Sequence, residues 1–260
     1  MLAEFRPALI ITRREVRDQF RDWRIIVPIV GLTIFFPALM NFTAAQAINF
    51  VQQYGADLVG QRLIPFLLMV VGFFPTSIAL VIALESFVGE KERRSIEPLL
   101  SSPLSDGQLY VGKLLASMVP PLVAAYLGIM VYLVGLNRQI GYQPEPVLLI
   151  QILLLTTVHA VVMVSGAVVI STQTTSARAA NLLASFVIIP MALLIQAESM
   201  IMFWGRYVVL WLMIVAMMTI AALLIRTGVA HFNREELLGR ELDTLHGTRS
   251  RGLRCDQGNG

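Results

Sequence analysis

The chain has 260 residues, of which 56% are hydrophobic and only 14% charged, and its mean hydropathy is +0.71. Soluble domains are about 45–50% apolar, so this composition excludes an ordinary soluble domain and predicts a membrane protein. The net charge of +3 does not indicate nucleic acid as a partner, because the basic residues cluster beside apolar segments. The single cysteine, Cys255, excludes a disulfide within the chain.

Residues 1–24 predict a cytoplasmic amphipathic helix that lies in the membrane interface among lipids. At the helical period, its large apolar side chains fall within a sector of about 60°. They are Leu2, Phe5, Leu9, Val16, Phe20 and Trp23. Arginines flank this sector on one side and acids gather opposite, so the arginines are expected among headgroups and the acids toward water or a partner. The alternative is a solvated helix that packs on its own chain.

Residues 25–227 predict a transmembrane domain of six helices, which makes the expected fold class an all-α membrane protein. A helix needs about 20 mostly apolar residues to cross the bilayer. Such segments occur at Ile25–Ala44, Ile64–Leu84, Leu114–Leu136, Val147–Ile170, Leu182–Met202 and Tyr207–Ile225. Only a turn at Trp204-Gly205-Arg206 is expected between the last two spans. The longest external loop is expected at Ala45–Leu63, because its glutamines and Asp57 favour water.

The basic residues indicate the orientation of these spans. Of the 20 Lys and Arg residues, 17 belong to one side of the predicted membrane. They lie before the first span, after the last span, and in or beside the loops that follow spans 2 and 4. The three exceptions are Arg62, Arg138 and Arg206. By the positive-inside rule, both termini and these loops are expected in the cytoplasm. The tail, residues 228–260, is therefore expected to be cytoplasmic, and its Gly- and Arg-rich end from Thr248 is expected to be disordered.

A possible phosphate loop lies at Gly107-Gln-Leu-Tyr-Val-Gly112-Lys113. The pattern GxxxxGK[ST] requires a hydroxyl after the lysine to bind magnesium, and that position is Leu114. A phosphate loop also follows a strand and opens a soluble helix, whereas a turn precedes Gly107 and a membrane span follows Lys113. The sequence therefore predicts no ATP site here. Lys113 is expected to be an interfacial cation at the start of span 3, with Gly112 permitting close packing.

A short charged helix is predicted at residues 89–102, between spans 2 and 3. Residues of alternating charge lie at Glu90, Lys91, Glu92, Arg93, Arg94 and Glu97, and Ile96, Leu99 and Leu100 form a small apolar face. Pro103 is expected to end the helix. Two interpretations are equally consistent with this pattern: a helix that docks into a cytoplasmic partner, and a solvated helix that only keeps the spans apart.

The same stretch, GEKERRSIEPLLSSPLSDGQLYVGK, resembles a signature of the ABC-2 type transporter permeases, which reads E-K-E-R-G-T-L-E-x-L-L-x-x-P followed by GK. The matching residues are Glu92, Arg93, Ile96, Glu97, Leu99, Leu100, Pro103, Gly112 and Lys113. Arg94 and Ser95 depart from the usual Gly-Thr. The resemblance extends to the six-span layout, the amphipathic N-terminal helix and the start of the tail at Phe232–Leu238.

The resemblance implies that this chain is not an enzyme and carries no cofactor of its own. ATP and magnesium are expected on a separate ATP-binding cassette ATPase subunit, and a second permease subunit is expected to complete a homodimer or heterodimer. The coupling helix would contact the ATPase through Glu90, Glu92, Arg93, Ile96, Glu97, Leu99 and Leu100. The implied activity is ATP-driven transport, usually export, through a cleft between two permeases of a bacterial or archaeal plasma membrane.

Polar side chains within the spans are candidates for a substrate pathway, since ionisable groups at membrane depth are functional by default. The candidates are Asn41, His159, Gln196 and Glu198. His159 is expected to be an interhelical hydrogen-bond partner rather than a metal ligand, because no zinc spacing occurs, and Glu198 is expected in an external gate or re-entrant element. Glu85, His159 and Glu198 are expected at three depths, which argues against an intramembrane enzyme. A non-transporting subunit that assembles a complex is the other alternative.

Overall fold

Helices are the only regular secondary structure in the described part of the chain. The computed structural model describes residues 2–53, 57–86, 106–173 and 177–231. Its helices are α1 (Leu2–Gln19), α2 (Trp23–Gln53), α3 (Asp57–Leu84), α6 (Asp106–Ile140), α7 (Pro146–Gln173), α8 (Ala177–Phe203) and α9 (Tyr207–His231). All except α1 are long and apolar enough to cross a membrane. The six predicted spans and the all-α fold class are therefore confirmed.

Three helices form the centre of the bundle and three lie around it. In α3, α6 and α7, 67%, 56% and 61% of the most apolar window is buried, whereas α2, α8 and α9 bury only 17%, 28% and 22%. Two large apolar clusters fill most of the interior: one includes Leu80, Leu114 and Met163, and the other includes Leu68 and Ile152. The peripheral helices consequently present most of their apolar side chains outward, as a surface in contact with lipid or another subunit would require.

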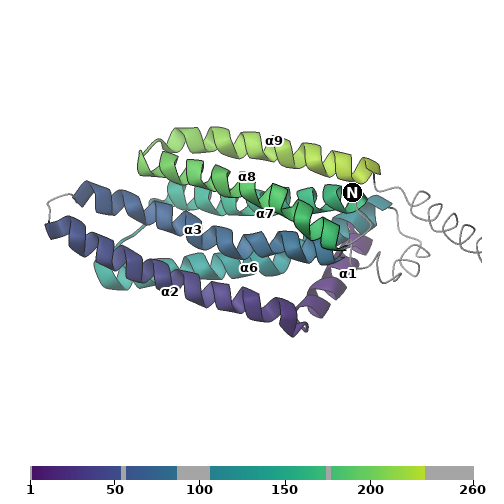
Figure 1. The fold of residues 1–260 in the computed structure, drawn as a ribbon, viewed down its shortest axis with the longest axis horizontal. Coiled ribbons are helices and arrows are strands. Elements are labelled where there is room, and N and C mark those ends of the chain that lie inside the picture. The colour runs from purple at the N-terminus through teal and green to yellow at the C-terminus, as the bar shows by residue number, and fades with distance from the viewer. Residues whose placement is uncertain (1, 54–56, 87–105, 174–176, 232–260) are drawn as a thin grey trace, which may run out of the picture.

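The short helix α1 lies across one end of the bundle (Figure 1). At this end α1 meets the start of α6, where Gly112 lies against Ala8, and the last turn of α9 meets α6 where Gly228 lies against Tyr110. Ser86, two residues after the end of α3, also lies here. We call this the α1 end. The α6–α7 and α8–α9 connections lie at the opposite end (Figure 1).

Local sequence signals explain where several helices begin and end. Asp22 caps α2, because its side-chain Oδ1 accepts a hydrogen bond from the Arg24 backbone N–H at 2.9 Å. The turn predicted between the last two spans is present. It is a Schellman motif in which Gly205 has φ of 72° and the Arg206 N–H donates to the Ile201 carbonyl at 3.2 Å. Gly141, with φ of 67°, ends α6 in a similar left-handed conformation.

Two of the expected boundaries are wrong. The Ala45–Leu63 external loop is mostly helix, because α2 continues to Gln53 and α3 already begins at Asp57. Glutamine is a good helix former, so a helix continues where hydropathy falls. Span 3 likewise starts within a longer helix, since α6 begins at Asp106 and includes the whole of Gly107–Lys113. The predicted coupling helix at 89–102 and the tail from 232 lie outside the described residues.

Candidate functional site

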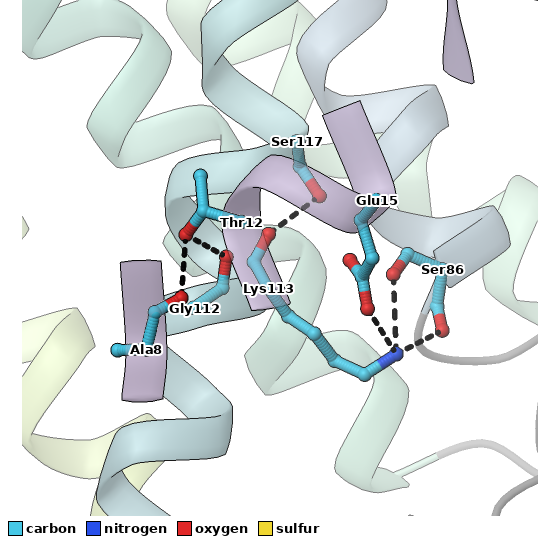
Figure 2. A network of polar contacts seen from close by, with 7 residues as sticks. All are labelled: Ala8, Thr12, Glu15, Ser86, Gly112, Lys113 and Ser117. Carbon is cyan, nitrogen blue, oxygen red and sulfur yellow. Dashed lines mark hydrogen bonds and ion pairs between the residues drawn. The ribbon is translucent and has the colours of Figure 1, made fainter. Parts of the chain in front are cut away.

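Lys113 is the centre of a polar cluster at the α1 end (Figure 2). Its side chain is only 4% exposed, and its Nζ lies 3.4 Å from Oε1 of Glu15 on α1. The same Nζ donates to the backbone carbonyl and to the Oγ of Ser86, both at 3.4 Å. One ammonium group therefore joins three elements: α1, the start of α6 and the segment that follows α3. Lys113 is buried in this contact, and its expected interfacial position at the start of span 3 stays a prediction.

Close packing of α1 on α6 makes this cluster possible. The hydroxyl of Thr12 lies 3.0 Å from the carbonyl oxygen of Gly112 and 2.9 Å from that of Ala8, and donates its hydrogen between them (Figure 2). A Cβ atom at Gly112 would lie 3.0 Å from the Ala8 carbonyl oxygen and 3.2 Å from Cβ of Ile11. The expectation that Gly112 permits close packing is thus confirmed, and the packed element is α1.

The helix α1 combines features of both interpretations of the N-terminal segment. Its face on α6 contains Ala8, Thr12 and Glu15, so it packs on its own chain, as the alternative expected, and Glu15 faces Lys113 instead of water or a partner. Three members of the predicted apolar sector are exposed: Leu9 of α1 by 57%, Phe20 just after it by 49%, and Trp23 at the start of α2 by 74%, whereas Val16 is half-buried. An exposed apolar ridge is what an interfacial helix requires, and the location of this ridge in the membrane interface stays a prediction.

An acidic hollow of about 220 Å³ lies beside Lys113, where α1, the start of α2 and the end of α3 meet. It is lined by Glu15, Asp18, Gln19, Ile25, Ile82, Glu85 and Ser86. Three carboxylates at the hollow favour a cationic group over an anionic one. The hollow shares Glu15 and Ser86 with the Lys113 cluster, so any change in the direction of α3 at this end alters both.

The Lys113 cluster holds Ser86, the residue before the charged segment, and lies on the helix that follows the segment. That segment leaves the described structure after Ser86 and returns at Asp106, two helical turns before Lys113. The seven residues expected to contact an ATPase, Glu90, Glu92, Arg93, Ile96, Glu97, Leu99 and Leu100, all lie outside the described residues. The structure therefore shows the residues that flank the segment and not the segment itself.

A second polar contact lies inside the bundle. His159 of α7 and Glu198 of α8 are 1% and 0% exposed, and the His159 Nε2 lies 3.3 Å from the Glu198 Oε2. The other ring nitrogen, Nδ1, lies 2.6 Å from the Leu155 carbonyl oxygen one turn earlier in α7. The expectation that His159 joins two helices is in agreement with this contact.

The expected separation of His159 and Glu198 in depth is wrong. Counted from the ends of their spans the two residues lie at different levels, but their contact shows that α7 and α8 are offset along the bundle. Glu85 lies apart from them, on the acidic hollow at the α1 end. Glu198 lies within the continuous helix α8, which has no re-entrant turn at this position.

The other two pathway candidates occupy different surroundings. Asn41 of α2 is buried, with its side chain against Gly135 of α6. Gln196 is exposed on α8, two residues from the buried Glu198. Among the described residues, no group of three or more His, Cys, Asp or Glu side chains is arranged to hold a metal ion.

Sequence reasoning missed the partners in the Lys113 cluster. Thr12, Glu15 and Ser86 carry no motif, and the only signal was the gathering of acids on one face of the N-terminal helix. Acids on one face of a helix are expected where that face meets a buried basic residue of another helix. The sequence pattern of the first helix does not identify which residue that is.

Comparison with known families gives one match. A family model described as an ABC-2 family transporter protein matches residues 9–203 of the 260. The match includes α1 from Leu9, the helices α2, α3, α6, α7 and α8, and the whole charged segment. No curated protein matches the chain.

Proposed function

Because this chain belongs to the ABC-2 transporter family and is a multi-pass integral membrane protein, we propose that it exports a substrate as one of two permease subunits driven by a separate ATPase. The family supports the role of a permease component in an ABC transporter. Export, the second permease and a cleft between the two permeases are the further parts of the proposal. ATP and magnesium bind the ATPase subunit, and both termini face the cytoplasm in a bacterial or archaeal plasma membrane.

The observation that carries the proposed coupling is the Lys113 cluster. In the proposal, residues 89–102 form the coupling helix and sit on the ATPase. A movement of that helix acts on Ser86 and Asp106, the residues that flank the charged segment. Lys113 ties the Ser86 side to α6 and, through Glu15, to α1. Movement of the ATPase would therefore shift α3, α6 and α1 together, and α3 and α6 are two of the three central helices.

The proposed cleft uses the peripheral helices. The apolar faces of α2, α8 and α9 are largely exposed, and Gln196 adds a polar group to the exposed surface of α8. In the proposal Gln196 faces the pathway directly, whereas Asn41, His159 and Glu198 reach it only when the surrounding helices part. The scarcity of charge within the spans suits an amphiphilic or hydrophobic substrate better than a small ion.

The proposal is tested by affinity purification of the tagged chain from its native membrane, with the co-purified ATPase identified by mass spectrometry. Reversing a charge with Glu97→Lys, or removing the apolar face with Leu99→Ala and Leu100→Ala, should strongly reduce co-purification of the ATPase and leave membrane insertion unchanged. Glu241→Lys in the tail is the matched charge reversal and should have no effect. Undiminished ATPase recovery with the Glu97 and Leu99/Leu100 variants would reject the coupling role.

Transport is tested with the permease and its ATPase reconstituted in liposomes. Export predicts that ATP moves a fluorescent amphiphile from the ATPase side to the other side and that the amphiphile stimulates ATP hydrolysis. Stable association with the ATPase but no stimulation by a panel of lipids, dyes and peptides would favour the non-transporting alternative.

A further inference from the structure

The hydrogen bond of His159 to its own helix fixes the role of each ring nitrogen. The Leu155 carbonyl oxygen can only accept, so the Nδ1 that lies 2.6 Å from it carries the hydrogen. In a neutral imidazole the other nitrogen, Nε2, is then an acceptor. That acceptor lies 3.3 Å from Glu198 Oε2.

Two acceptors at this distance require a proton between them. A carboxylate facing the Nε2 lone pair would repel it, and the pair would carry a net negative charge in an apolar interior. With one proton the pair is neutral overall and attractive, either as carboxylic acid with imidazole or as carboxylate with imidazolium. The geometry therefore requires one proton on the His159–Glu198 pair in addition to the proton on Nδ1.

The surroundings place that proton on Glu198. Neither carboxyl oxygen of Glu198 accepts a hydrogen bond from the described residues, whereas a buried carboxylate is stable only when several donors or charges compensate it. The neighbours along α8 on the same side, Ile195 and Met202, are buried and apolar. A neutral carboxylic acid that donates from Oε2 to Nε2 needs no further donor.

Other ionisable groups on the packed helices lie near the helix ends or are uncharged phenols. They are Asp57 and Arg62 of α3; Asp106, Tyr110, Lys113, Tyr126, Tyr132 and Arg138 of α6; Arg178 of α8; and Tyr207, Arg226 and His231 of α9. Lys113 is engaged with Glu15, and Arg62 donates to the Phe203 carbonyl at 3.4 Å. Among these, the charged groups belong to the two ends of the bundle.

We propose that His159 and Glu198 form a proton-binding site between α7 and α8, loaded with one proton in this closed arrangement. The second part of the proposal rests on the proposed transport function: when the cycle separates α7 from α8 and admits water, the carboxylic acid gives its proton to that water and becomes a carboxylate. The proton is taken up again as the helices close and water leaves. Each turnover would then bind and release a proton at a place remote from the ATPase.

Infrared difference spectroscopy on the purified chain in lipid bilayers tests the loaded site without any partner. The spectrum of the wild type minus that of Glu198→Gln at pH 7 should contain the C=O band of a protonated carboxylic acid. Gln is nearly isosteric and can donate to Nε2, so the variant should fold. The same subtraction for Glu145→Gln, an exposed acid before α7, should show only carboxylate bands. Carboxylate bands for Glu198 would overturn the proposal.

The release step is tested on the complex with the ATPase, trapped with a transition-state analogue of ATP. Loss of the Glu198 carboxylic acid band on trapping, and its return when the analogue is removed, are the expected results. A band that persists unchanged in a complex that still hydrolyses ATP would overturn proton release while leaving the proposed transport function intact. Failure to form the complex would instead count against the proposed function.

Discussion

At the scale of single residues, Lys113 shows how a charge can be buried at the end of a membrane helix. The ammonium group loses its hydration, but Glu15 supplies an opposite charge and Ser86 supplies two oxygen acceptors. Burial of a cation is tolerable only with such compensation. Substitutions of Lys113 and of its partners should therefore be tolerated less well than substitutions of an exposed interfacial lysine.

Glu15→Gln should destabilise the chain more than the double variant Glu15→Gln with Lys113→Met. The single change leaves a buried ammonium group facing neutral oxygens, at a cost of about 1–3 kcal/mol. The double change removes the buried charge as well, and apolar replacement of a buried ion pair is often close to neutral. Unfolding midpoints in detergent provide the measurement, with Glu145→Gln, an exposed acid at the opposite end of the bundle, as the control. Equal midpoints for Glu15→Gln and Glu145→Gln would contradict the role given to the pair.

At the scale of elements, the contact between α1 and α6 depends on the missing side chain of Gly112. Gly107, one and a half turns earlier in α6, has nothing within 4 Å of its Cβ position, so the two glycines form a matched pair. Gly107→Ala should stabilise the chain slightly, by less than the roughly 0.5–1 kcal/mol of a helix interior, because Gly107 lies in the first turn of α6. Gly112→Ala should instead destabilise it by about 1–3 kcal/mol, because the new methyl group meets the α1 backbone.

Limited trypsin digestion provides an independent measurement of this contact. Arg13, Arg14 and Arg17 lie on the exposed side of α1, and cleavage there requires local unfolding of the helix. Faster cleavage in Gly112→Ala than in Gly107→Ala is expected. If both variants are cleaved at the wild-type rate, α1 is not held by this contact.

The ends of α6 and α8 depend on backbone conformation. Gly141 and Gly205 have positive φ, which costs other residues about 1–2 kcal/mol. Each glycine replaced by Ala should therefore lower the unfolding midpoint, whereas Gly31→Ala, in open space on α2, should raise it slightly. A Gly205→Ala variant as stable as the wild type would show that the α8–α9 turn can adopt another form.

The elements that could be predicted from the sequence are those specified by short stretches of chain. Twenty apolar residues define a span, and Gly205 between two apolar runs defines a turn. The extension of α2 to Gln53 was missed because hydropathy reports apolar length and not helix length. The Lys113–Glu15 and His159–Glu198 contacts join residues on different helices. Their pairing depends on how the helices are offset and rotated, which no single helix encodes.

At the scale of the whole molecule, the burial of the spans divides the structure into a stable centre and an adaptable periphery. The central helices α3, α6 and α7 bury most of their apolar side chains inside the bundle. The Lys113 cluster lies at the start of α6 and just after the end of α3, at the α1 end. The peripheral helices expose apolar faces that only lipid or another membrane subunit can cover. In the proposed transporter, force enters through the centre and the pathway opens at the periphery.

This arrangement requires the α1 end to face the cytoplasm, and the single native cysteine makes that requirement testable. Cys255 lies in the tail, which the positive-inside rule places in the cytoplasm. A membrane-impermeant maleimide should therefore label it only after the cells are permeabilised. In a Cys255→Ser background, Gln143→Cys in the α6–α7 connection at the opposite end should be labelled in intact cells. The reverse pattern would place Lys113 and the charged segment outside the cell, where no ATP is available, and would contradict the proposed coupling at its premise.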